Sequence, residues 1–366
     1  MSSYKIFQFS FGDGYAGSAK IAILSSELLQ EKGHRVILFA TKNSLTEKRA
    51  VQKGIEVAAL NSMQKFKNMM NEIIYYFEKE KPDFVISHHS LDRKVGFRLK
   101  KKFKSRFTNI GYRHNITKST PIIGPLLYNK YFDYLIACSG GVGESLLKSG
   151  IKKKKVKVIY NGIDVPDNLE KISGENIKQK FGIENKIVLG LSTWFHKERK
   201  GFDILFNAYS NLDDKFILLL VGIPDNGKEE VLNYAAEFGI DKSKIIMPGY
   251  VDNIWEYYKA MDIFLLPSRS EGFSLALLEA AAAKLPIAAS DIPGTNEFII
   301  DGENGLLFNL SHPDELFEKI VQLSKDTELA EKLAKEAQQK VYTNFLIEHY
   351  AENLNNFLLQ AKKTNG

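Results

Sequence analysis

Short apolar runs alternate with helical patterns along most of this chain, and the two halves of the chain show the same alternation. The runs suit buried strands, and the segments between them carry apolar side chains at helical spacing. In chain order, the runs are KIFQFSF, RVILFA, EVAAL, DFVISHH, NIGYRHN, DYLIACS, KIVLGLS, FILLLVG, KIIMPGYV and AMDIFLLPS. Strands that alternate with helices form mostly parallel sheets with helices on both faces. The pattern therefore predicts an α/β protein.

The alternation is interrupted near the middle of the chain, after KKKKVKVIYNGIDVP. Asn161 and Gly162 predict a turn, Pro166 stops any helix, and a polar stretch follows. A chain of 366 residues is long enough for two domains with separate cores. We therefore place the boundary here, between a first domain of residues 1–162 and a second domain of residues 163–344.

The stretch PSRSEGFSLALLEAAAAKLPIAASDIPGTNE, residues 267–297, is the most informative part of the second half. Glu271 lies where the apolar pattern of a strand breaks, and strong helix formers follow, so Glu279 lies about a turn and a half into a helix. The first backbone N–H groups of that helix offer a phosphate site. They belong to Phe273, Ser274 and Leu275. One carboxylate near a phosphate and another deeper in the same cleft suit a nucleotide sugar.

A second glycine-containing loop, in LPIAASDIPGTNEFI, points to the same strand ends, where open α/β sheets bind ligands. With this context, the stretch resembles the retaining glycosyltransferases of family 4, whose E-x7-E signature matches Glu271 and Glu279. The resemblance covers nearly the whole chain and is strongest over residues 187–308. It implies the GT-B architecture, in which two Rossmann-like domains face each other across a cleft. It also implies that residues 345–366 form a helix that crosses back to the first domain.

The resemblance gives each matching residue of the second domain a role. Glu271 would orient the sugar and stabilise positive charge near the anomeric centre, and Glu279 would hold the ribose hydroxyls. Lys200 matches the family's donor-phosphate lysine, whose ammonium group can neutralise the charge on the departing diphosphate. Arg199 is a candidate to replace an arginine that the family often has where this chain has Trp194. The residues expected to frame the nucleotide base are Tyr250 and Val251.

In the first domain, the resemblance singles out a histidine and a glycine-rich loop. His114, at a strand end, matches a histidine that commonly contacts the transferred sugar. His88, at another strand end, has weaker support, with His89 as a rival. Gly17 and Ser18 fit the loop that closes over the donor's phosphates in this family, although Ala16 stands where the family usually has its first glycine.

The same loop has two other interpretations. Gly12, Gly14 and Gly17 spell G-x-G-x-x-G between a strand and a helix, which is the dinucleotide fingerprint. An NAD site also needs an acidic residue at the end of the second strand, where this chain has Thr41 and Lys42. Glycines can also serve only to permit a tight turn. The loop by itself therefore does not distinguish among three roles: a contact with donor phosphates, an NADP site and a structural turn.

Positive charge is concentrated in residues 93–106, a segment that begins at Arg93 and ends at Arg106, and the whole chain has a net charge of +6. On a helix, the cations flank an apolar stripe of Val95, Phe97, Leu99 and Phe103. Such a helix either lies on an anionic membrane surface or faces solvent, and the two are about equal here. The apolar segment 120–128, expected to be a proline-containing loop, slightly favours membrane contact, but a buried interdomain or acceptor-site role explains it equally well. No nucleic-acid recognition module accompanies the charge.

Together these observations predict an enzyme of the GT-B class. It would be a retaining glycosyltransferase that moves a hexose-type sugar from a nucleoside-diphosphate donor, with a UDP-sugar favoured, to a hydroxyl of a glycan or glycolipid. Its biological context would be the synthesis of cell-surface polysaccharide or lipopolysaccharide. Two alternatives are an NADP-linked oxidoreductase that uses the loop of Gly12, Gly14 and Gly17, and a non-catalytic scaffold protein of the same fold.

The sequence predicts neither a metal nor a cofactor. No D-x-D triplet occurs, so cations and helix dipoles would stabilise the leaving group in place of Mg²⁺. Cys138 is the single cysteine, which excludes an intrachain disulfide. No apolar run approaches the roughly 20 residues of a spanning helix, and the N-terminus has no signal-peptide pattern. We therefore expect a cytoplasmic location, with peripheral attachment to the inner face of the cell membrane as a further hypothesis.

Overall fold

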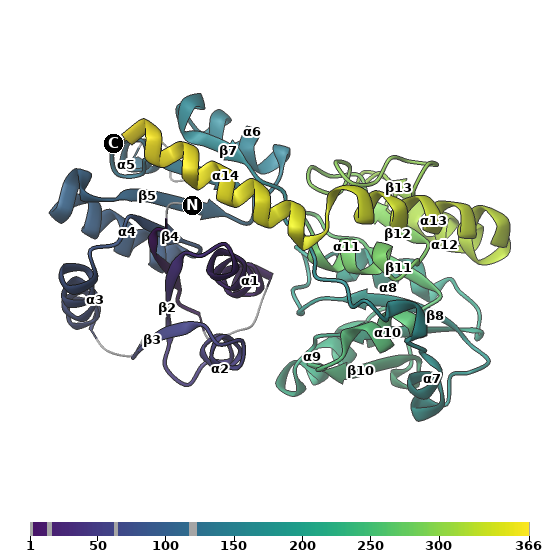
Figure 1. Cartoon of the computed structure of the whole chain (residues 1–366). Coiled ribbons are helices and arrows are strands. Elements are labelled where there is room, and N and C mark those ends of the chain that lie inside the picture. Colours follow the sequence, from purple (N-terminus) through teal and green to yellow (C-terminus); the bar gives the residue numbers. More distant parts are fainter. Residues whose placement is uncertain (1–2, 13–16, 62–64, 117–122, 366) are drawn as a thin grey trace. The chain divides into compact units, whose positions relative to one another are not determined.

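The computed structural model describes residues 3–12, 17–61, 65–116 and 123–365 (Figure 1). The chain divides into two compact units. Unit 1 contains residues 1–161 together with residues 347–366, and unit 2 contains residues 162–346. Each unit has its own parallel sheet with helices packed against it, and both are Rossmann-like, as the alternating pattern and the resemblance predict.

Unit 1 is built on a sheet whose described strands all pair in parallel, in the order β3-β2-β1-β4-β5-β6-β7. The strand order reverses between β1 and β4, which makes this the switch point of the sheet. β4 and β5 are buried along their whole length, as expected for central strands covered on both faces. The strands are β1 (Lys5–Ser10), β2 (Arg35–Thr41), β3 (Glu56–Leu60), β4 (Phe84–Ser87), β5 (Thr108–Arg113), β6 (Tyr134–Ala137) and β7 (Val156–Val158).

The last helix of the chain, α14 (Ile347–Asn365), belongs to unit 1 and packs against α1 and β5. Phe357 meets Tyr134 edge to face with 5.2 Å between ring centroids, and Asn355 Oδ1 lies 2.8 Å from His34 Nε2. A segment remote in sequence therefore completes this unit. The other helices of unit 1 are α1 (Gly17–Glu31), α2 (Leu45–Gln52), α3 (Phe66–Glu80), α4 (Ser90–Phe103), α5 (Ile123–Tyr131) and α6 (Gly140–Lys148).

Unit 2 repeats the architecture with the strand order β10-β9-β8-β11-β12-β13, and its switch point lies between β8 and β11. β9 is apolar and buried at every position. The strands are β8 (Ile187–Ser192), β9 (Phe216–Val221), β10 (Ile245–Gly249), β11 (Ile263–Leu266), β12 (Ile287–Ser290) and β13 (Leu306–Phe308). The helices are α7 (Glu175–Phe181), α8 (Phe202–Ser210), α9 (Asp225–Ala236), α10 (Ile254–Ala260), α11 (Leu275–Ala282), α12 (Glu315–Lys325) and α13 (Thr327–Asn344).

The basic segment of residues 93–106 is largely helical, but its apolar stripe is internal. Phe97 packs against Phe132 with 5.0 Å between ring centroids. The other three members of the stripe are buried in the core of unit 1: Val95, Leu99 and Phe103. The hypothesis that this stripe lies on a membrane is therefore wrong, because these side chains already fill the core. The exposed face of α4 carries Lys94, Arg98, Lys101 and Lys102.

The loop expected over residues 120–128 is also wrong where the structure describes it, because α5 begins at Ile123. Pro125 lies in the first turn of α5, where a missing N–H removes no intrahelical hydrogen bond. Ile123 and Leu126 are each 64% exposed. Residues 117–122 lie outside the described residues. None of the described helices is both long and apolar enough to cross a bilayer.

Two loops of unit 2 approach each other at a glycine. Gly201 has φ +66°, and a Cβ atom built there would lie 1.9 Å from the carbonyl oxygen of Pro267. The loop after β8 and the loop after β11 can therefore meet backbone to backbone only if this residue has no side chain.

We expect Gly201→Ala to destabilise unit 2 by about 3 kcal/mol or more, because the overlap with Pro267 adds to the cost of placing a non-glycine residue in the left-handed region. Urea unfolding followed by the fluorescence of Trp194 and Trp255 measures this loss, since both tryptophans of the chain lie in unit 2. Gly182→Ala is the matched control: Gly182 has φ +64°, but no atom lies within 4 Å of the added Cβ. Its cost should be about 1 kcal/mol. Equal losses for the two variants would contradict the importance of the close approach.

Candidate active site

The loops after β8 and β11 lie at the switch point of unit 2, where open α/β sheets bind ligands. Residues 193–201 form the first loop and residues 267–274 form the second. Lys200 comes from the first loop and Glu271 from the second. The topology therefore brings together two residues that the sequence predicts to act on one ligand.

Lys200 and Glu271 form a buried ion pair. Lys200 Nζ donates a hydrogen bond to Glu271 Oε1 at 2.8 Å, and the two side chains are only 11% and 7% exposed. A buried carboxylate and a buried ammonium are each costly alone, so each depends on the other. An ammonium group has three donors, so Lys200 can also bind an anionic ligand while it keeps this partner.

Arg269 ties the two loops together. Its guanidinium donates to both carboxylate oxygens of Asp203 at 2.6 Å, and Nη1 also donates to the carbonyl of Glu198 at 3.0 Å. Its backbone N–H donates to the carbonyl of Arg199 at 2.9 Å. The hydrogen bonds to Asp203 raise the pKa of Arg269, so the clamp stays charged. These bonds hold the ion pair in a fixed geometry, because they span the loops that carry its two members.

A second glycine packs on the other side of the loop of residues 267–274. Gly294, in the turn after β12, has φ +91°, and a Cβ atom there would lie 2.3 Å from the carbonyl oxygen of Gly272. Ser290, at the end of β12, donates a hydrogen bond from Oγ to the carbonyl of Ser268. The loop that carries Glu271 is therefore held by backbone contacts with both neighbouring loops.

Helix α11 begins where the sequence predicts. Ser274 caps it by accepting a hydrogen bond on Oγ from the backbone N–H of Leu277 at 3.3 Å. The helix therefore presents the backbone N–H groups of residues 273–275 at its start. Glu279 lies in the second turn, and the hydroxyl of Tyr258 donates to its Oε2 at 2.8 Å. Burial and the charge of Glu279 raise the pKa of Tyr258, so this donor keeps its proton.

The other predicted donor contacts of unit 2 are half-buried or exposed. Tyr250 follows β10 and is 58% exposed, and Val251 next to it is half-buried. Trp194, which stands where the family often has an arginine, is 43% exposed. Arg199 is half-buried, and its backbone N–H donates to His196 Nδ1 at 3.3 Å. The roles of these residues toward a donor stay predictions.

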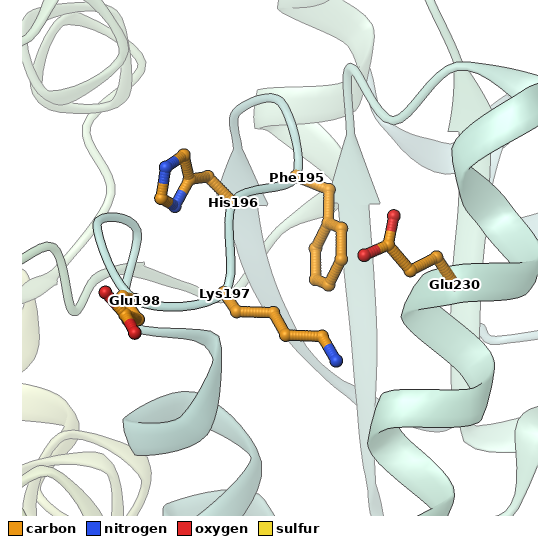
Figure 2. A pocket seen from close by; sticks show the side chains of 5 residues that line it. All are labelled: Phe195, His196, Lys197, Glu198 and Glu230. Carbon is orange, nitrogen blue, oxygen red and sulfur yellow. The ribbon is translucent and has the colours of Figure 1, made fainter.

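The loop of residues 193–201 also lines an open hollow of about 350 Å³. Figure 2 shows its five lining side chains, four on the loop and one on α9. They are Phe195, His196, Lys197, Glu198 and Glu230. Lys197 Nζ lies 4.3 Å from the ring centroid of Tyr234, which also belongs to α9. Lys197 therefore contacts an aromatic ring, whereas Lys200, three residues later, contacts Glu271.

In unit 1, Gly17 and Ser18 form the start of α1, and Gly12 lies just beyond β1. Gly14 and Ala16 fall within residues 13–16, which are outside the described residues. The predicted contact of this loop with the donor phosphates therefore stays a prediction.

The two strand-end histidines of unit 1 touch each other. His114 follows β5 and is half-buried, and its Nε2 lies 3.0 Å from Nδ1 of His88, which follows β4. His88 Nε2 lies 2.6 Å from Gln8 Oε1 on β1. His89, the alternative candidate to His88, has its Nε2 atom 3.3 Å from Ser10 Oγ. The sequence patterns did not single out Gln8, although a glutamine inside the apolar run KIFQFSF is a signal that could have identified it.

Among the side chains that the structure describes, no group of three or more His, Cys, Asp and Glu residues could hold a metal ion. The polar groups at the unit 2 site are instead an ammonium, backbone N–H groups and two carboxylates. This set can bind a diphosphate through the donors and sugar hydroxyls through the carboxylates.

Comparison with protein families gives two matches that together cover most of the chain. Residues 173–340 match the family described as glycosyl transferases group 1. Residues 16–166 match the family described as glycosyltransferase family 4. The matches therefore fall separately on unit 2 and on most of unit 1.

Individual relatives agree with these families. An uncharacterized glycosyltransferase of Methanocaldococcus jannaschii is 30% identical over 67% of this chain and 61% of its own length. The UDP-Gal:α-D-GlcNAc-diphosphoundecaprenol α-1,3-galactosyltransferase of Escherichia coli is 28% identical over 53% of this chain and 51% of its own. The alignments thus span between half and two thirds of these curated relatives. The crystal structure of Anabaena HepE in complex with UDP-glucose superposes with a TM-score of 0.86, at 19% identity, over 98% of this chain and 100% of that one. This likeness establishes the shared fold.

We expect Lys200→Met to destabilise unit 2 by about 2–4 kcal/mol, because it leaves the carboxylate of Glu271 buried without its cation. The double variant Lys200→Met/Glu271→Met should be more stable than Lys200→Met alone, since it removes both buried charges. Urea unfolding followed by the fluorescence of Trp194 and Trp255 measures these two variants and Glu271→Met, the single variant that completes the cycle. If the stability losses of the two single variants sum to that of the double variant within about 0.5 kcal/mol, the two charges do not depend on each other.

Proposed function

We propose that this chain, which belongs to glycosyltransferase family 4, transfers a hexose-type sugar from a UDP-sugar to an acceptor hydroxyl with retention of the anomeric configuration. The observation that carries the proposal is the buried pair of Lys200 and Glu271 at the switch point of unit 2, with the start of α11 next to it in sequence. A cation, a helix N-terminus and two carboxylates, Glu271 and Glu279, match the parts of a nucleotide sugar.

Each group has a task in this reaction. Lys200 and the N–H groups of residues 273–275 would neutralise the diphosphate as its bond to the sugar breaks. Glu271 would orient the sugar and stabilise positive charge at the anomeric carbon. Glu279, held by Tyr258, would accept hydrogen bonds from the ribose hydroxyls. The reaction would need no metal ion, because this chain's own donors carry the charge of the leaving group.

The acceptor in our proposal is a glycan or a lipid-linked glycan, used in the synthesis of cell-surface polysaccharide or lipopolysaccharide. Support comes from the E. coli relative, whose name specifies a diphosphoundecaprenol-linked acceptor. The exposed cations of α4, such as Lys101 and Lys102, offer an electrostatic contact with an anionic membrane surface.

The two alternatives explain less. An NADP-linked oxidoreductase would use the loop of Gly12, Gly14 and Gly17, and Lys42, which follows β2, is a cation that suits a 2′-phosphate. This alternative, however, gives no task to the pair of Lys200 and Glu271. A non-catalytic scaffold protein does not need this buried pair for its function. The transfer assay below distinguishes a scaffold protein from an enzyme.

The first experiment is a donor screen in the presence of EDTA. We expect one UDP-sugar, among a panel of UDP-, GDP- and ADP-sugars, to raise the melting temperature and to be slowly hydrolysed to the nucleoside diphosphate. With that donor, Lys200→Met should lower kcat by about 100-fold, the cost of removing one donor to a developing negative charge. Detection of the released nucleoside diphosphate measures hydrolysis. Once an acceptor is found, NMR of the anomeric proton of the product tests retention.

Lys197→Met is the matched control for the donor screen, because it removes a lysine of the same loop that contacts Tyr234 instead of Glu271. It should change kcat by less than about threefold, since its charge lies in the hollow of Figure 2. Stabilisation by NADPH with no response to any nucleotide sugar would reject the proposal in favour of the oxidoreductase. Loss of activity in EDTA that Mg²⁺ restores would reject the metal-independent mechanism.

Glu279→Gln should raise KM for the donor about tenfold and leave kcat within about threefold, because a ribose contact is made equally in the ground state and the transition state. Tyr258→Phe should have the same effect with a smaller magnitude, because it removes only the hydroxyl that positions Glu279. Steady-state kinetics with the donor from the screen measure both. A drop in kcat at unchanged KM would instead place Glu279 at the reacting centre.

A further inference from the structure

The exposed side of α5 is apolar, which is the reverse of an ordinary surface helix. Its exposed residues are Ile123, Leu126, Leu127 and Lys130. They follow the spacing i, i+3, i+4 and i+7, so they form one stripe along the helix. Three of the four are large aliphatic side chains, and Ile123 and Leu126 are each 64% exposed. A surface helix normally presents polar residues along such a stripe.

The packing of α5 on α4 keeps this stripe on the outside. Tyr128 and Tyr131 contact the ring of Phe97 on α4, with 5.4 Å and 6.0 Å between ring centroids. Arg93 Nε, also on α4, donates a hydrogen bond to the hydroxyl of Tyr128 at 3.1 Å. These contacts fix the rotation of α5 about its own axis, so the aliphatic side chains cannot turn inward without breaking them.

The segments that contact α5 carry exposed cations. Asn129 joins α5 to the turn after α6, because its Nδ2 donates to the carbonyl of Gly150 at 2.9 Å and its Oδ1 accepts from the backbone N–H of Lys152 at 3.0 Å. The exposed cations of this turn are Lys152, Lys153 and Lys154, and those of α4 include Lys94, Arg98 and Lys101.

These cations have few acidic neighbours. The chain has no Asp or Glu from residue 93 to residue 132. Asp133, directly after this stretch, accepts a hydrogen bond from Lys100 Nζ at 2.5 Å. Glu144, on α6, lies 2.7 Å from Lys148 Nζ. Each of these two carboxylates is therefore paired with a lysine of its own, and the surface around α5 has an excess of positive charge.

We propose that α5 docks unit 1 on an anionic lipid bilayer. Ile123, Leu126 and Leu127 would enter the boundary between headgroups and acyl chains, and the cations of the neighbouring segments would contact lipid phosphates. An anionic bilayer offers what this surface lacks, because it places an apolar interior directly beneath a layer of negative charge. Water covers the aliphatic stripe in the free protein, and burial in the bilayer removes that unfavourable contact.

This inference goes beyond the proposed function, because docking does not depend on the transfer of a sugar. It also differs from the membrane hypothesis for the stripe of Val95, Leu99 and Phe103 on α4, whose side chains are buried in the core. The aliphatic side chains of α5 are exposed, and the cations of α4 supply only the electrostatic part of the contact.

Sedimentation of the full chain with vesicles tests the docking surface. We expect the protein to bind vesicles of phosphatidylglycerol and phosphatidylcholine, more weakly as salt rises, and to bind phosphatidylcholine alone poorly. Ile123→Ser/Leu126→Ser should lower the partition coefficient by about tenfold or more. Leu45→Ser/Val51→Ser is the matched control, because both residues are exposed on α2, which packs against β2 and β3 at the other end of the sheet. It should leave binding unchanged, and both variants should keep the melting temperature of the unmodified protein.

The cations are tested in the same assay. Lys101→Gln/Lys153→Gln removes one exposed cation from each neighbouring segment and should also lower binding by about tenfold or more. Lys32→Gln/Lys48→Gln removes two exposed lysines elsewhere in unit 1 and should have a much smaller effect.

A fluorescent label tests whether α5 enters the bilayer. Cys138, the single cysteine, is buried, so a cysteine introduced by Leu127→Cys can be labelled selectively with the environment-sensitive dye NBD. We expect a blue shift of its emission on anionic vesicles, and no shift for the same dye on Val51→Cys.

The possible results separate docking from the alternatives. No binding to anionic vesicles, or equal binding by Ile123→Ser/Leu126→Ser and its control, would overturn the proposal. Binding without a blue shift at Leu127→Cys would mean electrostatic contact alone. A dimer of the free protein that Ile123→Ser/Leu126→Ser dissociates would mean that a second copy covers the stripe. Hydrolysis of the donor in solution tests the proposed function separately, and the α5 variant should leave it unchanged.

Discussion

The geometry of the unit 2 site depends on how closely three backbone loops can approach one another. The loop that carries Glu271 lies between Gly201 and Gly294, and a single added carbon at either glycine would overlap a carbonyl oxygen of that loop. Because the loops meet backbone to backbone, short-range hydrogen bonds from Arg269 and Ser290 can fix their spacing. An ion pair as buried as Lys200 with Glu271 is stable only if both partners are held at contact distance. The close approach that the two glycines allow is therefore a precondition for the buried ion pair.

The two units use the same topology to assemble different chemistry. In each, a parallel sheet reverses its strand order once, and the polar groups cluster at the ends of the strands beside the reversal. In unit 2 the cluster is charged and its positions are fixed by ion pairs and a guanidinium clamp. In unit 1 it is a network of Gln8, His88 and His114, whose side chains lie at hydrogen-bond distance from one another and whose imidazole rings are stacked. A charged cluster suits a diphosphate, and a neutral one suits a sugar, because burial penalises ions far more than hydroxyls.

The sequence predicts the strands, the helices and the positions of Glu271 and Glu279 because these depend on local pattern. Apolar runs identify buried strands, and the helix formers after Ser274 place α11 correctly. It does not predict the contacts of Tyr258, Arg269 and Gln8, since each partner is distant in the chain and only the folded topology brings them together. Two predictions, the membrane-facing stripe on α4 and the loop at Pro125, are wrong for different reasons. Hydrophobic side chains look alike in sequence whether they fill a core or face outward, and those of α4 fill the core of unit 1. A proline indicates a loop in sequence, but it is tolerated in the first turn of a helix, where α5 has Pro125.

Helix α14 has a consequence for how the chain is made. Unit 2 is one continuous stretch of residues, so it can fold on the ribosome as soon as Leu346 has emerged. Unit 1 contains residues that precede unit 2 and residues that follow it, because α14 packs on α1 and β5. Unit 1 can therefore be completed only after unit 2 has been synthesised, and its surface around α1 and β5 stays uncovered until α14 has been made. A chain that ends before α14 would have a complete second unit and an incomplete first one.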